Sequence, residues 1–185
     1  PAQLLFHHGR IHTGAAVAPQ GWVLVAEGRI AACGEGEPPS APEAERIDLE
    51  GGLLAPGLVD LHVHGAVGHD TMDATVEALK EMARFYARHG VTGFLATTMA
   101  APHAAVMAAL GAVAETKRQG SDGAALLGAH VEGPYVDVRR AGAQAPDSVR
   151  RADPAEYDEI LQSGVVRLIT LAPECQLQHR QDARR

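Results

Sequence analysis

The sequence predicts an α/β protein: a partial (β/α) barrel of the TIM type, with about four βα units, and a small β layer at the N-terminus. Short β-type runs broken by glycine fill residues 1–55. From Pro56 onward, strand-like and helix-like segments alternate, which is typical of a parallel sheet covered by helices. Polar residues recur where the strand-like runs end, as they do in barrels of this type.

Length and composition limit the class of protein. The 185 residues are 46% hydrophobic, which is enough to bury the core of one large or two small domains. The net charge is −7 without a dense basic cluster, so we expect a small-molecule partner and neither nucleic acid nor a membrane. Cys33 and Cys175 match no metal or disulfide spacing. No apolar run approaches ~20 residues and the start lacks a leader pattern, which favours a cytoplasmic location.

The β layer is expected over residues 1–55. Its β-type runs are QLLFHHGRIHTG, GWVLVAEGRIAACG and ERIDLEGGLL, and AEGRI is typical of a tight turn between paired strands. The segment GEGEPPSAPEAE predicts an exposed loop. The histidines of this layer, His7, His8 and His12, are given no role.

Three helices are predicted after the β layer, each with its own start and stop residues. Residues 73–90 place apolar side chains at helical spacing between an opening Asp or Thr and a closing glycine. Residues 101–120 repeat this pattern, with Pro102 in the first turn. Residues 153–164 begin with Asp153 where an N-cap belongs, followed by proline.

Four strand-like runs alternate with these helices and are apolar on both faces, as strands covered by helices should be. Their C-terminal ends carry the polar residues of interest, namely His62, His64, Thr97, Thr98, His130, Glu132 and Glu174. A parallel barrel gathers such ends on one face. Eight strands close a barrel of this type, and only four are counted here.

The first of these ends is the histidine pair in GLLAPGLVDLHVHG, residues 52–65. Side chains alternate along a strand, so His62 and His64 point to one side with about 6–7 Å between them along the chain. Both imidazoles could therefore bind one metal ion, and the alternative is two imidazoles packed in an ordinary strand. A barrel interior favours the metal, because buried imidazoles need partners there.

The third end repeats this alternation, so His130 and Glu132 also face one side. A carboxylate buried there without a cation would be strongly unfavourable, which makes a metal its natural partner. The alternative is a glutamate that faces solvent in the loop begun by Gly133-Pro134.

Several segments in order carry a resemblance: PGLVDLHVHG, GVTGFLATT, GAHVEGPYV, RAGAQ and VRLITLAPE. They resemble the amidohydrolase superfamily and, within it, the N-acetylglucosamine-6-phosphate deacetylase family, over nearly the full chain to Glu174. The resemblance implies a metal-dependent hydrolase of amino-sugar metabolism that converts a small-molecule sugar phosphate to glucosamine 6-phosphate and acetate. It also implies a homodimer, because members are commonly dimers.

The resemblance assigns residues one by one. Glu132 matches the metal-binding glutamate, and His62 and His64 match a pair that helps to hold a second metal in some members. Ala143 and Gln144 fall where the family contacts the sugar, although many members have histidine in place of Gln144. His130 is expected to support a neighbouring ligand or to pack. Zinc, iron or another divalent ion would suit this ligand set.

Members of the family need about twice this length to close the barrel and complete the β layer. The absent half would hold two further metal-binding histidines, the phosphate-binding residues and the acid/base aspartate, so the catalytic residue is expected outside this chain. We expect a half-barrel at 56–174, an irregular tail at 175–185, and no activity from the chain alone. The chain is expected to be a truncated or frameshifted product, or a genuine short form. The alternatives are a non-catalytic fragment that binds metal or self-associates through its open sheet, and another amidohydrolase that acts on a cyclic amide.

Overall fold

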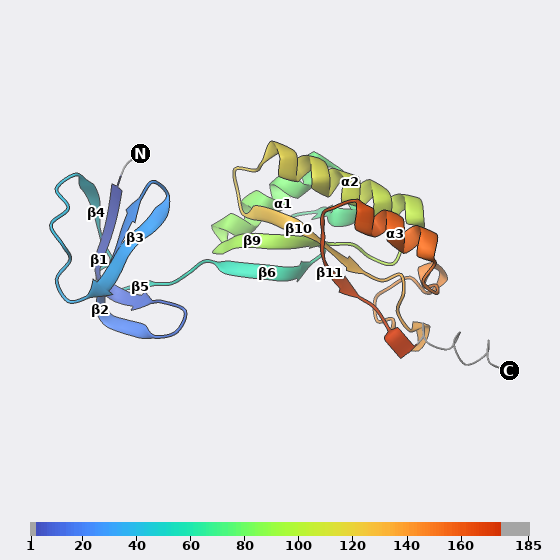
Figure 1. Ribbon diagram of the computed structural model, residues 1–185, viewed down its shortest axis with the longest axis horizontal. Coiled ribbons are helices and arrows are strands. Elements are labelled where there is room, and N and C mark those ends of the chain that lie inside the picture. The colour runs from blue at the N-terminus through green and yellow to red at the C-terminus, as the bar shows by residue number, and fades with distance from the viewer. Residues whose placement is uncertain (1–2, 175–185) are drawn as a thin grey trace. The chain divides into compact units, whose positions relative to one another are not determined.

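The computed structural model describes residues 3–174, so the predicted irregular tail at 175–185 lies outside the described residues. The chain divides into two compact units, Pro1–Pro56 and Gly57–Arg185, which are labelled by element in Figure 1. None of the described helices has both the length and the apolar character needed to cross a bilayer.

The N-terminal unit is one mixed β-sheet. Its strands are β1 (Gln3–His12), β2 (Val17–Ala26), β3 (Arg29–Glu35), β4 (Ala44–Asp48) and β5 (Leu53–Leu54). The order is β3-β2-β1-β4, with β5 also paired to β1. The β1–β2 and β2–β3 pairs are antiparallel, whereas β4 and β5 run parallel to β1.

The predicted tight turn joins β2 to β3. Glu27 and Gly28 have φ angles of 53° and 71°. Two successive residues at positive φ are what a two-residue hairpin loop needs to match the twist of its strands. The turn therefore fixes the pairing of β2 with β3, and through β2 the position of β1.

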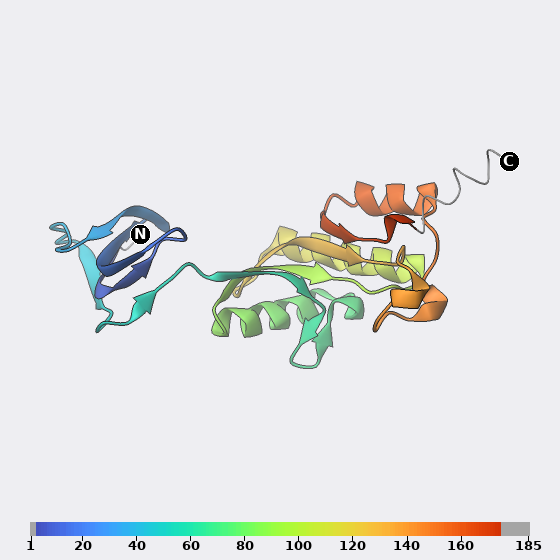
Figure 2. The same ribbon diagram turned by 90° about the horizontal axis from the view of Figure 1, so that it is seen from below.

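The C-terminal unit is built on a four-stranded parallel sheet. Its elements are β6 (Leu58–Val63), α1 (Val76–Arg88), β9 (Val91–Thr97), α2 (His103–Gln119), β10 (Ala125–Glu132), α3 (Pro154–Gln162) and β11 (Val166–Thr170). The sheet order is β11-β10-β9-β6. A short hairpin of β7 (Gly65–Ala66) and β8 (His69–Asp70) projects from this unit in Figure 2.

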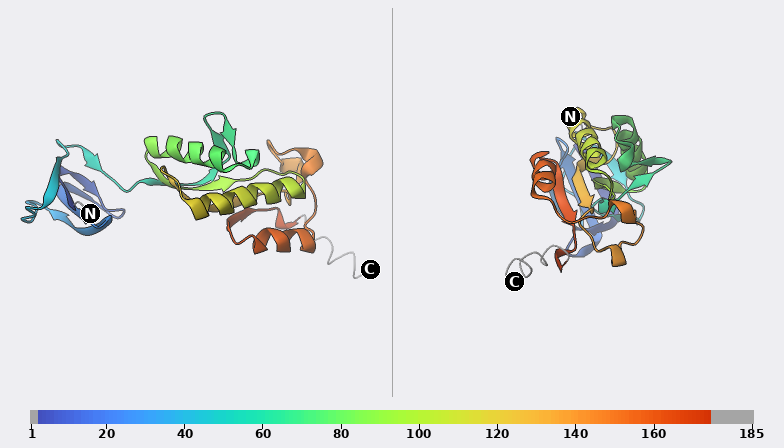
Figure 3. Two further views of the ribbon diagram at one scale, coloured as in Figure 1. Left: turned by 90° about the horizontal axis from the view of Figure 1, so that it is seen from above. Right: turned by 90° about the vertical axis from the view of Figure 1, so that its right-hand side faces the viewer.

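All three helices lie on one face of this sheet (Figures 1 and 3). The strand order follows the chain order, and crossovers between parallel strands are right-handed, so successive helices must fall on the same side. The core between helices and sheet contains Phe94 from β9, Leu79 and Met82 from α1, and Val106 and Leu110 from α2, each at most 1% exposed.

The helix ends follow the predicted start and stop residues. The Thr75 hydroxyl accepts a hydrogen bond from the backbone N–H of Ala78 at 3.2 Å and opens α1. Asp153 accepts from the N–H of Ala155 at 2.9 Å and opens α3. One detail was wrong: Pro102 is the residue before α2 rather than part of its first turn, because the helix begins at His103.

The prediction of strands that are apolar and covered on both faces is correct for most of β9 and for the C-terminal half of β10 but wrong for β6 and β11. Leu58 in β6 is 66% exposed and Leu168 in β11 is 39% exposed, because these strands form the two edges of a sheet whose helices cover one face. Glu174 is not at a strand end either, since β11 ends at Thr170. The described residues form a mixed α/β fold with an open parallel sheet and three helices, one fewer than four complete βα units require.

The helix-facing core gives a stability prediction. Replacing Leu110 by alanine removes a fully buried side chain and should lower the free energy of unfolding by about 2–5 kcal/mol. Leu58→Ala should lower it by less than about 1 kcal/mol, because most of that side chain is already in water. Urea unfolding followed by the helical circular-dichroism signal measures both, and equal losses would contradict this assignment of the core.

Candidate metal centre

Three of the residues singled out from the sequence meet at the C-terminal end of the sheet. His62 lies near the end of β6, His64 follows it, and Glu132 is the last residue of β10. The two Nε2 atoms are 3.3 Å apart, and Glu132 Oε2 is 3.2 Å from that of His62 and 3.0 Å from that of His64. Strand β9 lies between β6 and β10, so these side chains reach toward one another across a strand.

Hydrogen bonds to side chains, in addition to the backbone pairing with β9, hold the C-terminal end of β6. The register of β6 against β9 shifts between Asp60 and Val63. Within this irregular stretch the His62 N–H donates to Asp60 Oδ1 at 3.0 Å, and the Val63 N–H donates to the buried Thr97 Oγ1 at 2.9 Å. These two bonds fix the backbone on both sides of His62, and therefore the direction of its ring.

The orientation of His64 indicates which of its nitrogens is free to bind. Its Nδ1–H donates to the backbone carbonyl of Thr97 at 3.2 Å. In the neutral ring this leaves Nε2 with a lone pair that faces the Glu132 carboxylate. Two acceptors at 3.0 Å repel one another unless a second proton on His64 or a cation lies between them. The geometry therefore suits a metal ion, whose ligands commonly have such a carbonyl behind them.

His130 lies beneath this group rather than in it. The side chain is buried, its Nε2 is hydrogen-bonded to Thr170 Oγ1 at 2.8 Å, and its ring meets that of His62 edge to face at 4.8 Å. Burial lowers the pKa of His130 below its ordinary value, and the neighbouring His62 lowers it further. The ring is therefore expected to be neutral near pH 7 and to support His62 by packing.

Ala143 and Gln144, the expected sugar contacts, lie in the segment after β10. Ala143 is exposed, whereas Gln144 is buried and its Oε1 accepts a hydrogen bond from the Ala100 N–H at 2.6 Å. Arg150 fastens the same segment, because its Nη1 donates to the Ala101 carbonyl at 2.9 Å. The segment after β10 is thus tied to the loop that follows β9.

Sequence reasoning did not assign a role to Thr97, Thr170 or Arg150. Thr97 was noted only for its place at a strand end, although it contacts three neighbours of the centre: Val63, His64 and His130. The sequence offered one indication of this role: two threonines, Thr97 and Thr98, follow an apolar strand-like run. Nothing in the sequence around Thr170 or Arg150 pointed to their contacts.

Within residues 3–174, two groups could hold a metal ion: His62 with His64 and Glu132, and a second group in the N-terminal unit. His103 also pairs with a carboxylate, since its Nε2 lies 2.7 Å from Glu159 Oε2, but this pair belongs to neither group. The role of the first group as metal ligands stays a prediction.

The Amidohydrolase family matches residues 53–183. The chain is 44% identical over 133 residues to N-acetylglucosamine-6-phosphate deacetylase of Vibrio furnissii, covering 71% of this chain and 33% of that protein. It is 37% identical over 164 residues to the enzyme of the same name from Bacillus subtilis, covering 85% of this chain and 41% of that protein. It is 38% identical over 162 residues to N-acetylgalactosamine-6-phosphate deacetylase of Escherichia coli O157:H7, covering 84% of this chain and 41% of that protein. The chain thus spans 33–41% of the length of these relatives.

Solved structures give the same picture. A variant of N-acetyl-D-glucosamine-6-phosphate deacetylase from Mycobacterium smegmatis, in complex with N-acetyl-D-glucosamine-6-phosphate, matches with a TM-score of 0.84 and 31% identity, over 94% of this chain and 44% of that one. N-acetylglucosamine-6-phosphate deacetylase from Thermotoga maritima matches with a TM-score of 0.78 and 30% identity, over 95% of this chain and 44% of that one. The mixed α/β fold with its parallel sheet is the fold of these enzymes over the segment matched.

The cluster predicts a binding defect for one substitution. Glu132→Gln keeps the size of the side chain but removes the charge, and should weaken Zn²⁺ binding at this centre by about tenfold or more. Calorimetric titration of the 185-residue chain measures this as a correspondingly larger dissociation constant for one bound equivalent.

Glu159→Gln is the matched control, because Glu159 also pairs with a histidine but has no third ligand nearby. It should leave Zn²⁺ binding unchanged. Identical titrations for Glu132→Gln and Glu159→Gln would exclude Glu132 as a ligand.

Proposed function

Because the chain belongs to the amidohydrolase family, we propose that it supplies the metal-binding part of a hydrolase that removes the acetyl group from N-acetylglucosamine 6-phosphate. The products would be glucosamine 6-phosphate and acetate. The observation that carries the proposal is the meeting of His62, His64 and Glu132 at one end of the parallel sheet. Its relatives in Vibrio furnissii and Bacillus subtilis are named for this reaction.

The ligand set fits a divalent ion. Two imidazole nitrogens and one carboxylate oxygen suit zinc or iron. A cation between His64 Nε2 and Glu132 Oε2 would also remove the repulsion between these two acceptor atoms. An ion bound there would act as a Lewis acid toward water and toward the acetamide carbonyl. The Glu132 side chain is 20% exposed, which leaves the centre open to a substrate from solvent.

The chain's own residues would hold and orient this centre. The Thr97 carbonyl keeps the Nδ1 proton of His64 in place, so that Nε2 remains the binding nitrogen. His130 supports the ring of His62 from below. Gln144 Oε1 is already bound to the Ala100 N–H, so the Gln144 amide hydrogens are the groups proposed to donate to a sugar hydroxyl, next to the exposed Ala143.

We also infer that the open sheet is the first half of a (β/α) barrel over residues 56–174, and that residues 1–55 form a separate small β layer. The parallel order β6, β9, β10, β11 along the chain supports this, as does the match to about 44% of the length of the solved deacetylases. The homodimer and the cytoplasmic location stay predictions.

Hydrolysis also needs a group that takes a proton from water and gives it to the leaving amine. Asp60 and Asp70 are the nearby aspartates in sequence, and both are engaged. Asp60 Oδ1 accepts from the His62 N–H, and Asp70 Oδ1 accepts from the Met72 N–H at 2.7 Å. We therefore propose that the acid/base comes from the part of such enzymes that this chain does not span.

A second substrate is favoured by one relative, the N-acetylgalactosamine-6-phosphate deacetylase of Escherichia coli O157:H7 at 38% identity. Both sugar phosphates carry the same acetamide and the same phosphate, so the metal centre would serve either. The competing non-catalytic function, self-association, is favoured by the exposed edge strands β6 and β11.

The 185-residue chain, loaded with Zn²⁺ and assayed alone, should release no more acetate from N-acetylglucosamine 6-phosphate than its Glu132→Gln variant. Loss of general acid/base catalysis costs about 10²- to 10⁴-fold, and an absent phosphate anchor removes positioning as well. Turnover within about tenfold of an ordinary enzyme's ~10 s⁻¹ would show that the chain supplies its own acid/base.

Acetate release should appear when the chain is co-expressed with the C-terminal part of the Bacillus subtilis relative that it does not cover. Glu132→Gln should abolish this release and Glu159→Gln should preserve it, because only the first changes the metal centre. Comparing the two sugar phosphates as substrates decides between the epimers. A co-purified, metal-loaded complex that deacetylates neither would overturn the proposed function.

A further inference from the structure

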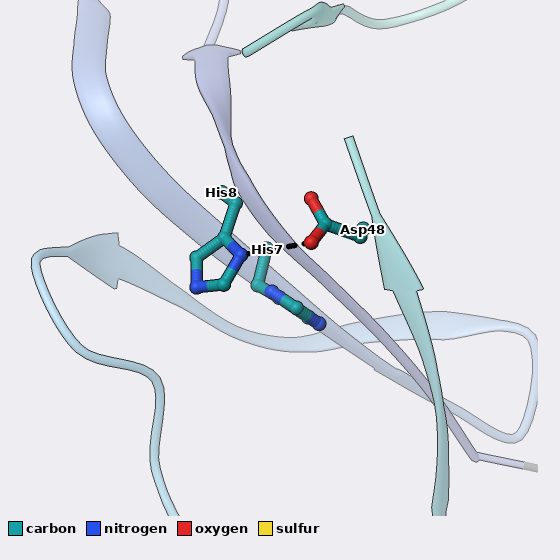
Figure 4. A group of neighbouring side chains, drawn as sticks. All are labelled: His7, His8 and Asp48. Atoms are coloured by element: carbon teal, nitrogen blue, oxygen red, sulfur yellow. Dashed lines mark hydrogen bonds and ion pairs between the residues drawn. The ribbon is translucent and has the colours of Figure 1, made fainter. Parts of the chain in front are cut away.

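The second group of metal-type ligands lies in the N-terminal unit and has no part in the proposed hydrolysis. It consists of His7 and His8 in β1 and Asp48, the last residue of β4. Each residue offers one ligand atom, and the three atoms lie within 4.8 Å of one another. Figure 4 shows the side chains grouped where β1 and β4 run next to each other.

The strand pairing explains why two consecutive histidines can share one ligand site. His7 is the register partner of Asp48 in the parallel β1–β4 pair, so these two side chains point to the same face of the sheet. By simple alternation His8 would point to the other face. Its φ of 56° and the register shift of β1 against β2 between Phe6 and Gly9 break this alternation, and His8 Nδ1 lies 3.0 Å from Asp48 Oδ2.

The backbone around the group is fixed by three hydrogen bonds. The Leu49 N–H donates to the His7 carbonyl at 2.9 Å, and the Gly51 N–H donates to the His8 carbonyl at 2.7 Å. The Glu50 N–H donates to Asp48 Oδ1 at 2.8 Å, which leaves Oδ2 directed toward His8. The turn after β4 is thus fastened to β1, and the ligands are held in place without an ion.

One ligand of the group lacks a partner. The His7 side chain is only 6% exposed, and its Nδ1 is buried without a hydrogen bond to any described atom. A buried polar atom is ordinarily satisfied, so an unpartnered ring nitrogen on a residue of this group supports a metal-binding role for His7. Its ring meets that of His8 edge to face at 4.2 Å.

An ion could reach the group from solvent. Asp48 and His8 are exposed, and a surface hollow of about 450 Å³ beside His8 is lined in part by glycines, among them Gly9, Gly21 and Gly51. The positive φ of His8 is uncommon for a residue other than glycine, and it is kept here by the hydrogen bonds around the group.

We propose that His7, His8 and Asp48 bind a divalent transition-metal ion, zinc being the first to test, at a structural site that joins β1 to β4. Two imidazoles and one carboxylate are a common zinc ligand set that leaves a further position for water. The site would clamp the sheet of the N-terminal unit independently of the hydrolase centre.

The test begins from His62→Asn/His64→Asn, a double variant in which the hydrolase centre is disabled. This chain should still bind one equivalent of Zn²⁺ in a calorimetric titration. His8→Gly and Asp48→Asn, each added to it, should weaken that binding by about tenfold or more, whereas His89→Asn, an exposed histidine of the other unit, should not.

His8→Gly separates binding from folding, because glycine accepts the φ of 56° without strain and should leave the melting temperature of the metal-free chain unchanged. His7 is buried, so it is followed by the NMR shift of its ring nitrogens on adding Zn²⁺ rather than by substitution. Absence of stoichiometric binding to the double variant, equal affinity in His8→Gly, or unshifted His7 nitrogens would each overturn the three-ligand site.

Discussion

Thr97, at the C-terminal end of the central strand β9, is bonded to both strands that carry the candidate hydrolase ligands. Its hydroxyl accepts the Val63 N–H from β6, its carbonyl accepts the Nδ1 proton of His64, and its Oγ1 lies 3.4 Å from His130 Nδ1 in β10. It is fully buried, so these contacts are made without competition from water. The spacing of the candidate metal ligands thus depends on one residue, Thr97, that is not itself a candidate ligand.

Much of the fold could be predicted because its determinants are local. A capping side chain and a closing glycine belong to a few consecutive residues, which is why the ends of α1 and α3 follow from the sequence. The meeting of His62 with Glu132 could be predicted too, since it requires only side-chain alternation and a parallel sheet. The exposure of Leu58 could not be predicted, because the sequence of an apolar strand does not show whether other elements cover it.

The contacts of Thr97 and the bend at His8 could not be predicted from the sequence for a different reason. Each depends on a break in regular strand geometry: the register shift near Val63, and the positive φ at His8. Alternation predicts that adjacent residues point to opposite faces, and in the pair His7-His8 a single left-handed residue reverses that result.

The candidate ligands of the proposed hydrolase centre lie in one continuous part of the chain, with His62 and Glu132 70 positions apart. The strands and helices between them are consecutive, so these three residues come together within one continuous stretch of the polypeptide, whereas the acid/base is proposed to come from outside it. At a synthesis rate of about 5–20 residues per second, Glu132 would leave the ribosome roughly 4–14 seconds after His62. All three proposed ligands would thus meet the cellular supply of the ion before the later part of a full-length relative had been made.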